Sequence, residues 1–255
     1  MVVELSSRGF PLQSTIQLSI FAHAAVMNLI TSADSNLGRR LHDCKRYKPV
    51  SLAVLSAQPR NITLRVAFLG KDGMQAAEVL AAGLTEIDSM QLGPNRWRIS
   101  NFYCSGAPWG ACCTWGDLTE PCADHWLEFA FVTPTAFTKS DGNGNRFVSV
   151  LPEPDDVFNC LMERWGQLGG PDLPLNLHHY VRSGGCIVCD ISIRSITTRL
   201  RERVQKGFTG KVTYELADRD LACVSAIHQL GRLAFFSGVG YQTARGMGAV
   251  RTHSW

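Results

Sequence analysis

The most specific group of residues lies near the C-terminus, where four glycines occur between Gly238 and Gly248 in the segment Gly-Val-Gly-Tyr-Gln-Thr-Ala-Arg-Gly-Met-Gly. Glycine adopts left-handed backbone conformations and lets backbone N–H groups approach a ligand closely. We therefore expect Gly238, Gly240, Gly246 and Gly248 to approach phosphates or base edges, with Arg245 as the counter-charge. The alternative is an ordinary turn before a last strand.

Two common phosphate-binding motifs do not match this segment. A dinucleotide fingerprint places Gly-x-Gly-x-x-Gly between a strand and a helix. Here the segment follows a helical pattern, and Thr243 stands where the third glycine would be. The lysine of a P-loop is also absent from the segment. Both nucleotide-binding classes are therefore excluded.

A histidine lies within a short basic cluster in the first half of the chain. Histidine exchanges protons near neutral pH, since its ordinary pKa is about 6.5. His42 precedes Lys48 by six residues, so one segment offers both a proton-exchanging group and a positive charge. Asp43 is the single acid of the cluster, whose five bases are Arg39, Arg40, Lys45, Arg46 and Lys48.

The other histidines are weaker candidates for chemistry. His23 shares a helical face with Ile16, Ile20 and Met27, and a histidine on an apolar stripe is more often part of the core. It is the second candidate after His42. His178 and His179 are expected in an exposed loop.

A second basic cluster lies in the second half of the chain. Such uneven charge is typical of a surface that binds a polyanion, although a charge run is more often a solvated surface. Its six bases, against Glu202, are Arg194, Arg199, Arg201, Arg203, Lys206 and Lys211.

The nine cysteines do not form the spaced framework of a small disulfide-rich protein, so we expect reduced thiols. Cys186 and Cys189 lie in an apolar strand pattern and are expected to be core thiols. A further group has spacings that do not match a standard zinc knuckle, so no metal or other cofactor is expected. This group comprises Cys104, Cys112, Cys113, Cys122 and His125.

The composition limits the class of protein. With 45% apolar and 18% charged residues in 255, global disorder is excluded. The longest apolar run, Ile16 to Ile30, is interrupted by Gln17, His23 and Asn28 and is shorter than a bilayer requires. We therefore expect no membrane span and a cytoplasmic protein.

The hydrophobic pattern predicts the same order of elements twice, β-α-β-β-α-β in each half. Two such units indicate an α+β protein with tandem ferredoxin-like domains and antiparallel sheets. We expect an N-terminal domain over residues 1–115 that carries the His42 segment, and a C-terminal domain over 125–255 that carries the glycine-rich segment. The predicted strands are 1–6, 51–57, 62–69, 96–103, 126–133, 185–197, 208–215 and 247–252, and the predicted helices are 11–27, a short one ending near 41, one starting at Asp72, 155–168 and 221–236.

Several motifs resemble those of the CRISPR repeat-processing endoribonucleases in order and spacing. The match is most specific at the C-terminus, and it reaches most of the chain except residues 104–122. The matching segments are Phe208 to Tyr214, Leu230 to Gly240, Thr243 to Gly248, Phe131 to Thr135, Leu151 to Pro154 with Phe158, Leu161 and Trp165, Leu41 to Asp43, and Lys48 to Ser51.

This resemblance implies a prokaryotic cytoplasmic enzyme that cuts precursor CRISPR RNA within repeats without a metal ion. The substrate's 2′-hydroxyl would attack, leaving a 2′,3′-cyclic phosphate and a 5′-hydroxyl, and the enzyme would retain the guide RNA. His42 would exchange protons, Lys48 would stabilise the phosphate charge, and His23 would stand second. The family's usual tyrosine is not evident near His23.

The resemblance also implies partners for the basic residues. Arg39, Arg40 and Lys45 would steer the RNA backbone, and the Arg194–Lys211 cluster would follow the phosphates of an RNA stem. Subunits of a CRISPR effector complex would be further partners. The alternative is a non-catalytic guide-RNA-binding subunit of such a complex.

Overall fold

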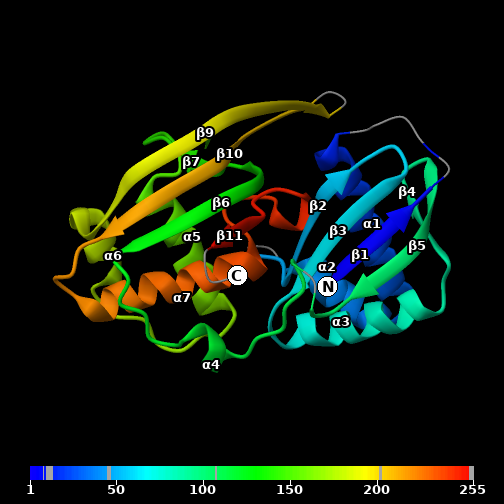
Figure 1. Ribbon diagram of the computed structural model, residues 1–255, viewed down its shortest axis with the longest axis horizontal. Helices are drawn as coiled ribbons and strands as arrows, with labels where there is room; N and C mark the ends of the chain where they lie inside the picture. The colour runs from blue at the N-terminus through cyan, green and yellow to red at the C-terminus, as the bar shows by residue number, and fades with distance from the viewer. Residues whose placement is uncertain (8, 10–13, 45–46, 107, 201–202, 253–255) are drawn as a thin grey trace. The chain divides into compact units, whose positions relative to one another are not determined.

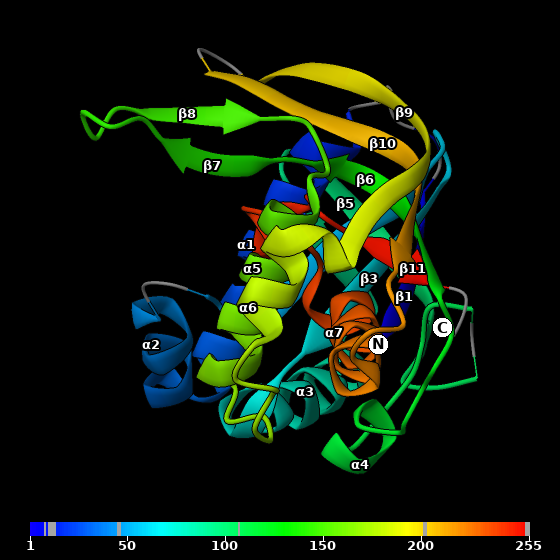
Figure 2. The same ribbon diagram turned by 90° about the vertical axis from the view of Figure 1, so that its left-hand side faces the viewer.

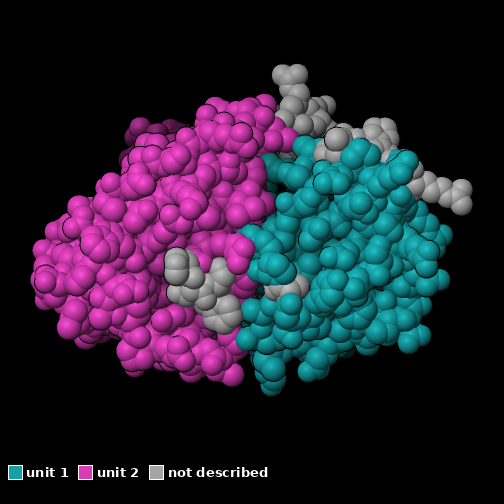
Figure 3. All heavy atoms as spheres, in the orientation of Figure 1, with its two compact units in different colours: residues 1–112, 242–246 teal, residues 113–241, 247–255 magenta. Residues whose placement is uncertain are grey.

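The computed structural model describes the chain except residues 8, 10–13, 45–46, 107, 201–202 and 253–255 (Figure 1). It contains helices and antiparallel sheets, which confirms the predicted α+β class. The chain packs as two compact units, residues 1–112 with 242–246 and residues 113–241 with 247–255 (Figure 3). The sequence did not predict that residues 242–246 pack with the first unit. The domain limits expected from the sequence, 1–115 and 125–255, stay a prediction.

The first unit has a five-stranded antiparallel sheet in the order β2-β3-β1-β5-β4. Without the edge strand β4, this is the strand order of a ferredoxin-like fold, with β1 in the centre. The elements are β1 (Val2–Ser6), α1 (Thr15–Ala33), α2 (Ser35–Asp43), β2 (Val50–Ala57), β3 (Asn61–Phe68), α3 (Gly70–Thr85), β4 (Ser89–Leu92) and β5 (Asn95–Tyr103).

Helix α1 owes its apolar composition to the core of this unit. Its residues Leu18, Ala22, Val26 and Ile30 are buried and pack with strand residues such as Leu64. The helix is long and apolar enough to span a membrane by length and composition alone. Because its buried face lies in a core that also contains β1, β2 and β3, packing within the unit explains that composition.

The second unit repeats the plan with a four-stranded antiparallel sheet in the order β11-β6-β10-β9. Helices α5 and α7 pack against each other and against strands of this sheet (Figure 1). The elements are α4 (Trp115–Leu118), β6 (Trp126–Thr135), β7 (Phe137–Ser140), β8 (Arg146–Ser149), α5 (Pro154–Gln167), α6 (Leu177–Tyr180), η1 (Val181–Gly185), β9 (Cys186–Leu200), β10 (Arg203–Leu216), α7 (Leu221–Ser237), η2 (Thr243–Arg245, packed with the first unit) and β11 (Val250–Thr252).

The core of the second unit is aromatic. Tyr214 lies edge-on to Phe129 and Phe158, with ring centroids 5.8 and 5.2 Å apart. Such edge-to-face pairs add to the stabilisation from apolar burial. The Tyr214 hydroxyl donates to the carbonyl of Pro152 at 2.9 Å, so its polar group has a partner in the buried environment.

Some elements differ from the sequence prediction. The β4–β5 pairing was not predicted, nor was the β7–β8 hairpin, which projects at the upper left of Figure 2. Asp72 lies in the first turn of α3 instead of starting it, because Leu69 is the N-cap residue. The last strand is shorter than predicted and begins at Val250. Cys186 is buried as expected, but Cys189 is exposed, so its prediction as a core thiol is wrong.

Candidate active site

Helix α2 presents His42 to solvent. Asp34 caps its start by accepting a hydrogen bond from the N–H of Leu37 at 2.9 Å. Leu37 and Leu41 are buried and anchor the helix, and the next residue, His42, has a side chain that is 85% exposed. Its Nδ1 lies 3.4 Å from Oδ1 of Asp43. A histidine with a ring exposed in this way can reach a ligand in solution.

Lys48 fixes the end of the helix that carries His42. Its Nζ donates to the carbonyl oxygen of Leu41 at 3.2 Å and to that of His42. The last carbonyls of a helix have no partner within the helix, and a positive charge there also interacts favourably with the helix dipole. Lys48 therefore holds the backbone of His42, and its positive charge lies beside that backbone.

His23 is a half-buried residue of α1 in a positively charged setting. Burial, and then the charges of Arg245 and Lys48, lower its pKa to about 4, while a hydrogen bond with the Ala244 backbone acts in the opposite direction. His42 contributes a smaller lowering effect. No residue that the structure describes hydrogen-bonds the buried Nδ1 of His23. His23 is therefore a neutral imidazole at neutral pH.

The short turn η2 brings Arg245 close enough to His23 for its charge to lower the pKa of that histidine. It packs on α1 and β2, and Arg245 is exposed while Ala244 is buried. Gly246 permits this approach, because a Cβ there would lie 2.3 Å from the Cβ of Ser19, and its φ of +99° favours glycine. The sequence indicated Arg245 only as the counter-charge of the glycine-rich segment, and the fold reveals its proximity to His23.

The glycines of the C-terminal segment are buried. The N–H groups of Val239, Tyr241 and Gly248 donate to the carbonyls of Gly248, Ala136 and Pro134 at 2.8, 3.0 and 3.1 Å. The expected cradle of exposed N–H groups is therefore wrong for these three residues. The exposed residues of the segment are Gln242 and Arg245, and binding of RNA by Gly238, Gly240, Gly246 and Gly248 stays a prediction.

In the first basic cluster, one arginine is bound to side chains of α3 and its neighbour is exposed to solvent. Arg40 donates from Nε to Oδ1 of Asp72 and from Nη2 to Gln75, both at 3.0 Å. Arg39 is exposed and has no polar partner among the residues that the structure describes. Lys45 lies outside the described residues. Arg39 is thus the described cation of this helix that can reach a ligand without breaking an ion pair.

The second basic cluster follows the long β9–β10 pair. Arg194 lies opposite Thr209 and Lys206 opposite Thr197 in the strand register. Lys211 forms an ion pair with Glu128 at 3.0 Å, and both side chains are exposed. The backbones of Arg199 and Arg203 belong to these strands, and Arg201 lies outside the described residues.

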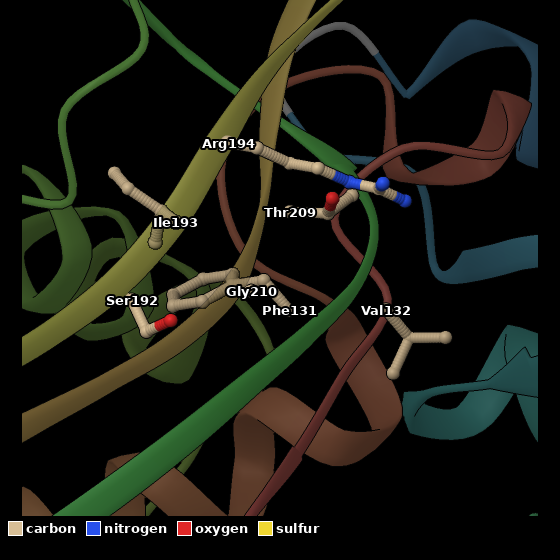
Figure 4. Close-up of a pocket in the computed structure, with 7 residues that line it drawn as sticks. All are labelled: Phe131, Val132, Ser192, Ile193, Arg194, Thr209 and Gly210. Atoms are coloured by element: carbon tan, nitrogen blue, oxygen red, sulfur yellow. The ribbon is translucent and has the colours of Figure 1, made fainter.

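A shallow groove of about 420 Å³ lies beside Arg194 (Figure 4). At Gly210 the two strands lie too close for a side chain, because a Cβ there would lie 2.1 Å from the carbonyl oxygen of Ser192. The side chain of Arg194 extends across Thr209 in Figure 4. One guanidinium and two hydroxyls can bind a phosphate, but the groove lining contains no group that exchanges protons near neutral pH. The lining residues are Phe131, Val132, Ser192, Ile193, Arg194, Thr209 and Gly210.

Within the described part of the chain, no three metal-ligating side chains lie together as a metal site. Cys112 instead donates weakly to the carbonyl of Cys104 at 3.8 Å, and Cys122 contacts Asp124 at 3.6 Å.

Comparisons with known proteins give consistent results. The family model of the CRISPR-associated endoribonuclease Cas6 matches residues 129–250. A Thermus thermophilus Cas6 product complex superposes with a TM-score of 0.86 at 26% identity, covering 98% of each chain. A further structure of Thermus thermophilus Cas6 gives a TM-score of 0.71 at 25% identity, covering 98% of this chain and 96% of that one.

A second Cas6 product complex has a TM-score of 0.79, with 99% of this chain and 97% of the other covered. Its 24% identity supports the shared fold alone. No curated protein sequence matches the chain.

Proposed function

Because this chain belongs to the Cas6 family of CRISPR-associated endoribonucleases, we propose that it cuts precursor CRISPR RNA within the repeats by metal-independent 2′-hydroxyl attack. The observation that carries the proposal is a pair of histidines in different environments. His23 is neutral at neutral pH, and His42 is exposed at the end of a fixed helix. The two cations Lys48 and Arg245 act on the same imidazole.

In this reaction the 2′-oxygen forms a bond to the adjacent phosphorus and the bond from phosphorus to the 5′-oxygen breaks. The neutral imidazole of His23 accepts the proton of the 2′-hydroxyl. His42 in its protonated form donates a proton to the leaving 5′-oxygen. The products are a 2′,3′-cyclic phosphate and a 5′-hydroxyl, so atoms and charge balance without a co-reactant.

A bound phosphate improves His23 as a base. The charges of Arg245 and Lys48 lower the pKa of the free histidine. A phosphate beside these cations offsets their charge and moves the pKa back toward its ordinary value. The same cations stabilise the additional negative charge on the phosphate in the transition state.

RNA binding in this proposal uses exposed cations of both units. Arg39, Arg194 and Arg245 are exposed in the structure, and Lys206 lies on the exposed side of β10. Product complexes have been obtained with related Cas6 proteins, which supports retention of the guide RNA by this chain. We further propose that it acts in a prokaryotic cytoplasm and passes the guide RNA to effector-complex subunits.

The test is cleavage of repeat RNA from the chain's own genomic array in EDTA. We expect the all-ribose RNA to be cut and an RNA with a 2′-deoxy residue at the cut position to stay intact. His42→Ala should reduce the single-turnover rate by roughly 10²- to 10⁴-fold, the usual contribution of general acid–base catalysis. His179→Ala is the matched control, because His179 is an exposed histidine on α6.

Two outcomes would contradict the proposal. Cleavage of the 2′-deoxy RNA would exclude attack by the 2′-hydroxyl. Tight binding with neither RNA cut would favour the non-catalytic guide-RNA-binding subunit, and the exposed His42 would then be an RNA contact.

A further inference from the structure

A buried arginine on α5 holds the start of the glycine-rich segment. Arg164 is 3% exposed. Its Nη1 donates to the carbonyl oxygen of Ser237 at 2.9 Å and to that of Gly238, and its Nη2 donates to the carbonyl oxygen of Gly240. Ser237 is the last residue of α7. One side chain therefore fixes the end of α7 and the first turn of the segment.

The chemistry at this position requires an arginine. Carbonyl groups at a helix C-terminus need donors from elsewhere, and a cation there also complements the helix dipole. A buried charge is tolerated when it is well hydrogen-bonded. The planar guanidinium presents several donors in a fixed arrangement and can reach three carbonyls, whereas the ammonium of a lysine is a single point charge.

Cys160, one helical turn before Arg164, binds the other backbone polar group of Gly240. The N–H of Gly240 donates to Sγ of Cys160 at 3.5 Å. Burial raises the pKa of this thiol, so it stays neutral. Gly240 has a φ of +79°, and a Cβ there would lie 2.3 Å from the carbonyl oxygen of Ala136. Both polar groups of Gly240 are thus bound to α5, in a conformation that favours glycine.

The chain leaves this clamp and enters an uncommon conformation two residues later. Gln242, with φ 57°, is the non-glycine residue with positive φ in the described chain. Such a residue persists when the flanking structure determines it strongly. Arg245 follows in the adjoining turn. The backbone that Arg164 holds at Gly240 thus leads, after four intervening residues, to Arg245.

We propose that Arg164 is a positioning residue for RNA cleavage, acting through the backbone that leads from Gly240 to Arg245. The inference rests on the proposed function, since Arg245 is assigned there to the scissile phosphate. Arg164 itself is buried and does not touch the RNA. It determines whether the Arg245 guanidinium is correctly placed before the substrate arrives.

The first test compares Arg164→Lys with a matched control. Arg232 is in the same unit and also donates to backbone carbonyls, those of Leu118 at 3.1 Å and Glu120 at 2.5 Å. We expect Arg164→Lys to lower the single-turnover cleavage rate roughly tenfold or more, since small displacements of a catalytic group are costly. Arg232→Lys should cleave at the wild-type rate. Equal rates for Arg164→Lys and wild type would overturn the inference.

A double-mutant cycle separates positioning from general destabilisation. If Arg164 acts through Arg245, the Arg164→Lys change should have little further effect in an Arg245→Ala background. If the rate reductions of the two single variants instead multiply in the double variant, Arg164 acts independently of Arg245, and the inference is overturned. If Arg164→Lys does not fold, Cys160→Ala replaces it in the same cycle, because it removes the second contact of α5 with Gly240.

Failure of the proposed function is distinguishable from failure of this inference. If the wild-type protein binds repeat RNA without cutting it, the proposed function fails. The cycle is then repeated with the dissociation constant for RNA carrying a 2′-deoxy residue. Non-additive losses of affinity would support the positioning role, and additive losses or none would contradict it.

Discussion

His23 and His42 are the same residue type in opposite settings. His42 is fixed through its backbone by Lys48 but has an exposed ring. His23 is half-buried, and burial is the largest cause of its lowered pKa. Two groups of one chemical type with different environments can serve as acid and base in a single reaction. The setting of His23 also has a consequence for stability that does not require RNA.

The stability of the protein should fall in acid through His23. Its pKa is about 4 in the folded state, against 6.5 when unfolded, so the unfolded state binds more protons between these values. The contribution is present above pH 6.5 and is lost as the pH falls toward 4. When the pH falls from 7.5 to 5, the unfolding free energy of wild type should decrease more than that of His23→Gln. The difference should be about 1 to 2 kcal/mol after allowance for partial exposure. Urea unfolding at both values measures this, and equal losses would contradict it.

The neighbouring arginines Arg39 and Arg40 should separate RNA binding from stability. Arg40 is bound to Asp72 and Gln75 of α3, whereas Arg39 is exposed. We expect Arg39→Ala to weaken RNA binding several-fold and leave the melting temperature unchanged. Arg40→Ala should lower stability by at most about 1 kcal/mol, because the ion pair is exposed. Filter binding and thermal unfolding of both variants give the comparison, and an unchanged affinity for Arg39→Ala would refute it.

At the scale of the element, the end of α2 is where the proposed chemistry depends on the stability of a helix. Lys48 donates to two carbonyls there, so Lys48→Gln removes a charge from a helix C-terminus. We expect a loss of about 0.5 to 1 kcal/mol in unfolding free energy. Lys48→Gln should lower the cleavage rate more than the control Lys206→Gln does, because without Lys48 the backbone of His42 is less well held. A Lys48→Gln enzyme with the wild-type rate would show that Lys48 neither positions His42 nor stabilises the phosphate.

Regular elements were predictable where their apolar pattern is long enough to show a period. Helices α1, α5 and α7 and most strands of both sheets meet this condition. Strands β4, β7 and β8 have four residues each, which is too short for an alternation to be recognised. Their pairing depends on neighbours in space, as does the exposure of Cys189 beside an irregularity in the β9–β10 register.

The candidate site was predictable only where its residues are neighbours in the sequence. His42 and Lys48 are close in sequence, and the local charge pattern indicated them as candidates. The proximity of Arg245 to His23 joins residues far apart in the chain, and it depends on Gly246 fitting against Ser19. The role of the buried glycines could not be predicted, because a glycine pattern does not show whether the neighbouring N–H groups are already bonded.

For the molecule as a whole, net charge is a poor guide to RNA binding. The formal charge is only +3, and several bases are engaged with acids, including Lys211 with Glu128 and Arg182 with Asp155. What an RNA phosphate meets is the subset of cations that are exposed and not paired. Among the residues that the structure describes, Arg194 belongs to this subset and lines the groove of Figure 4, whereas Arg182 is paired.

The salt dependence of RNA binding should therefore distinguish two substitutions that change the net charge equally. Each phosphate contact contributes about 0.7 to 0.9 to the slope of log affinity against log salt. We expect Arg194→Ala to reduce the slope by about this amount and Arg182→Ala to leave it unchanged. The measurement is a salt titration of affinity for 2′-deoxy repeat RNA. If both variants reduce the slope equally, net charge governs binding and the groove beside Arg194 has no specific part in it.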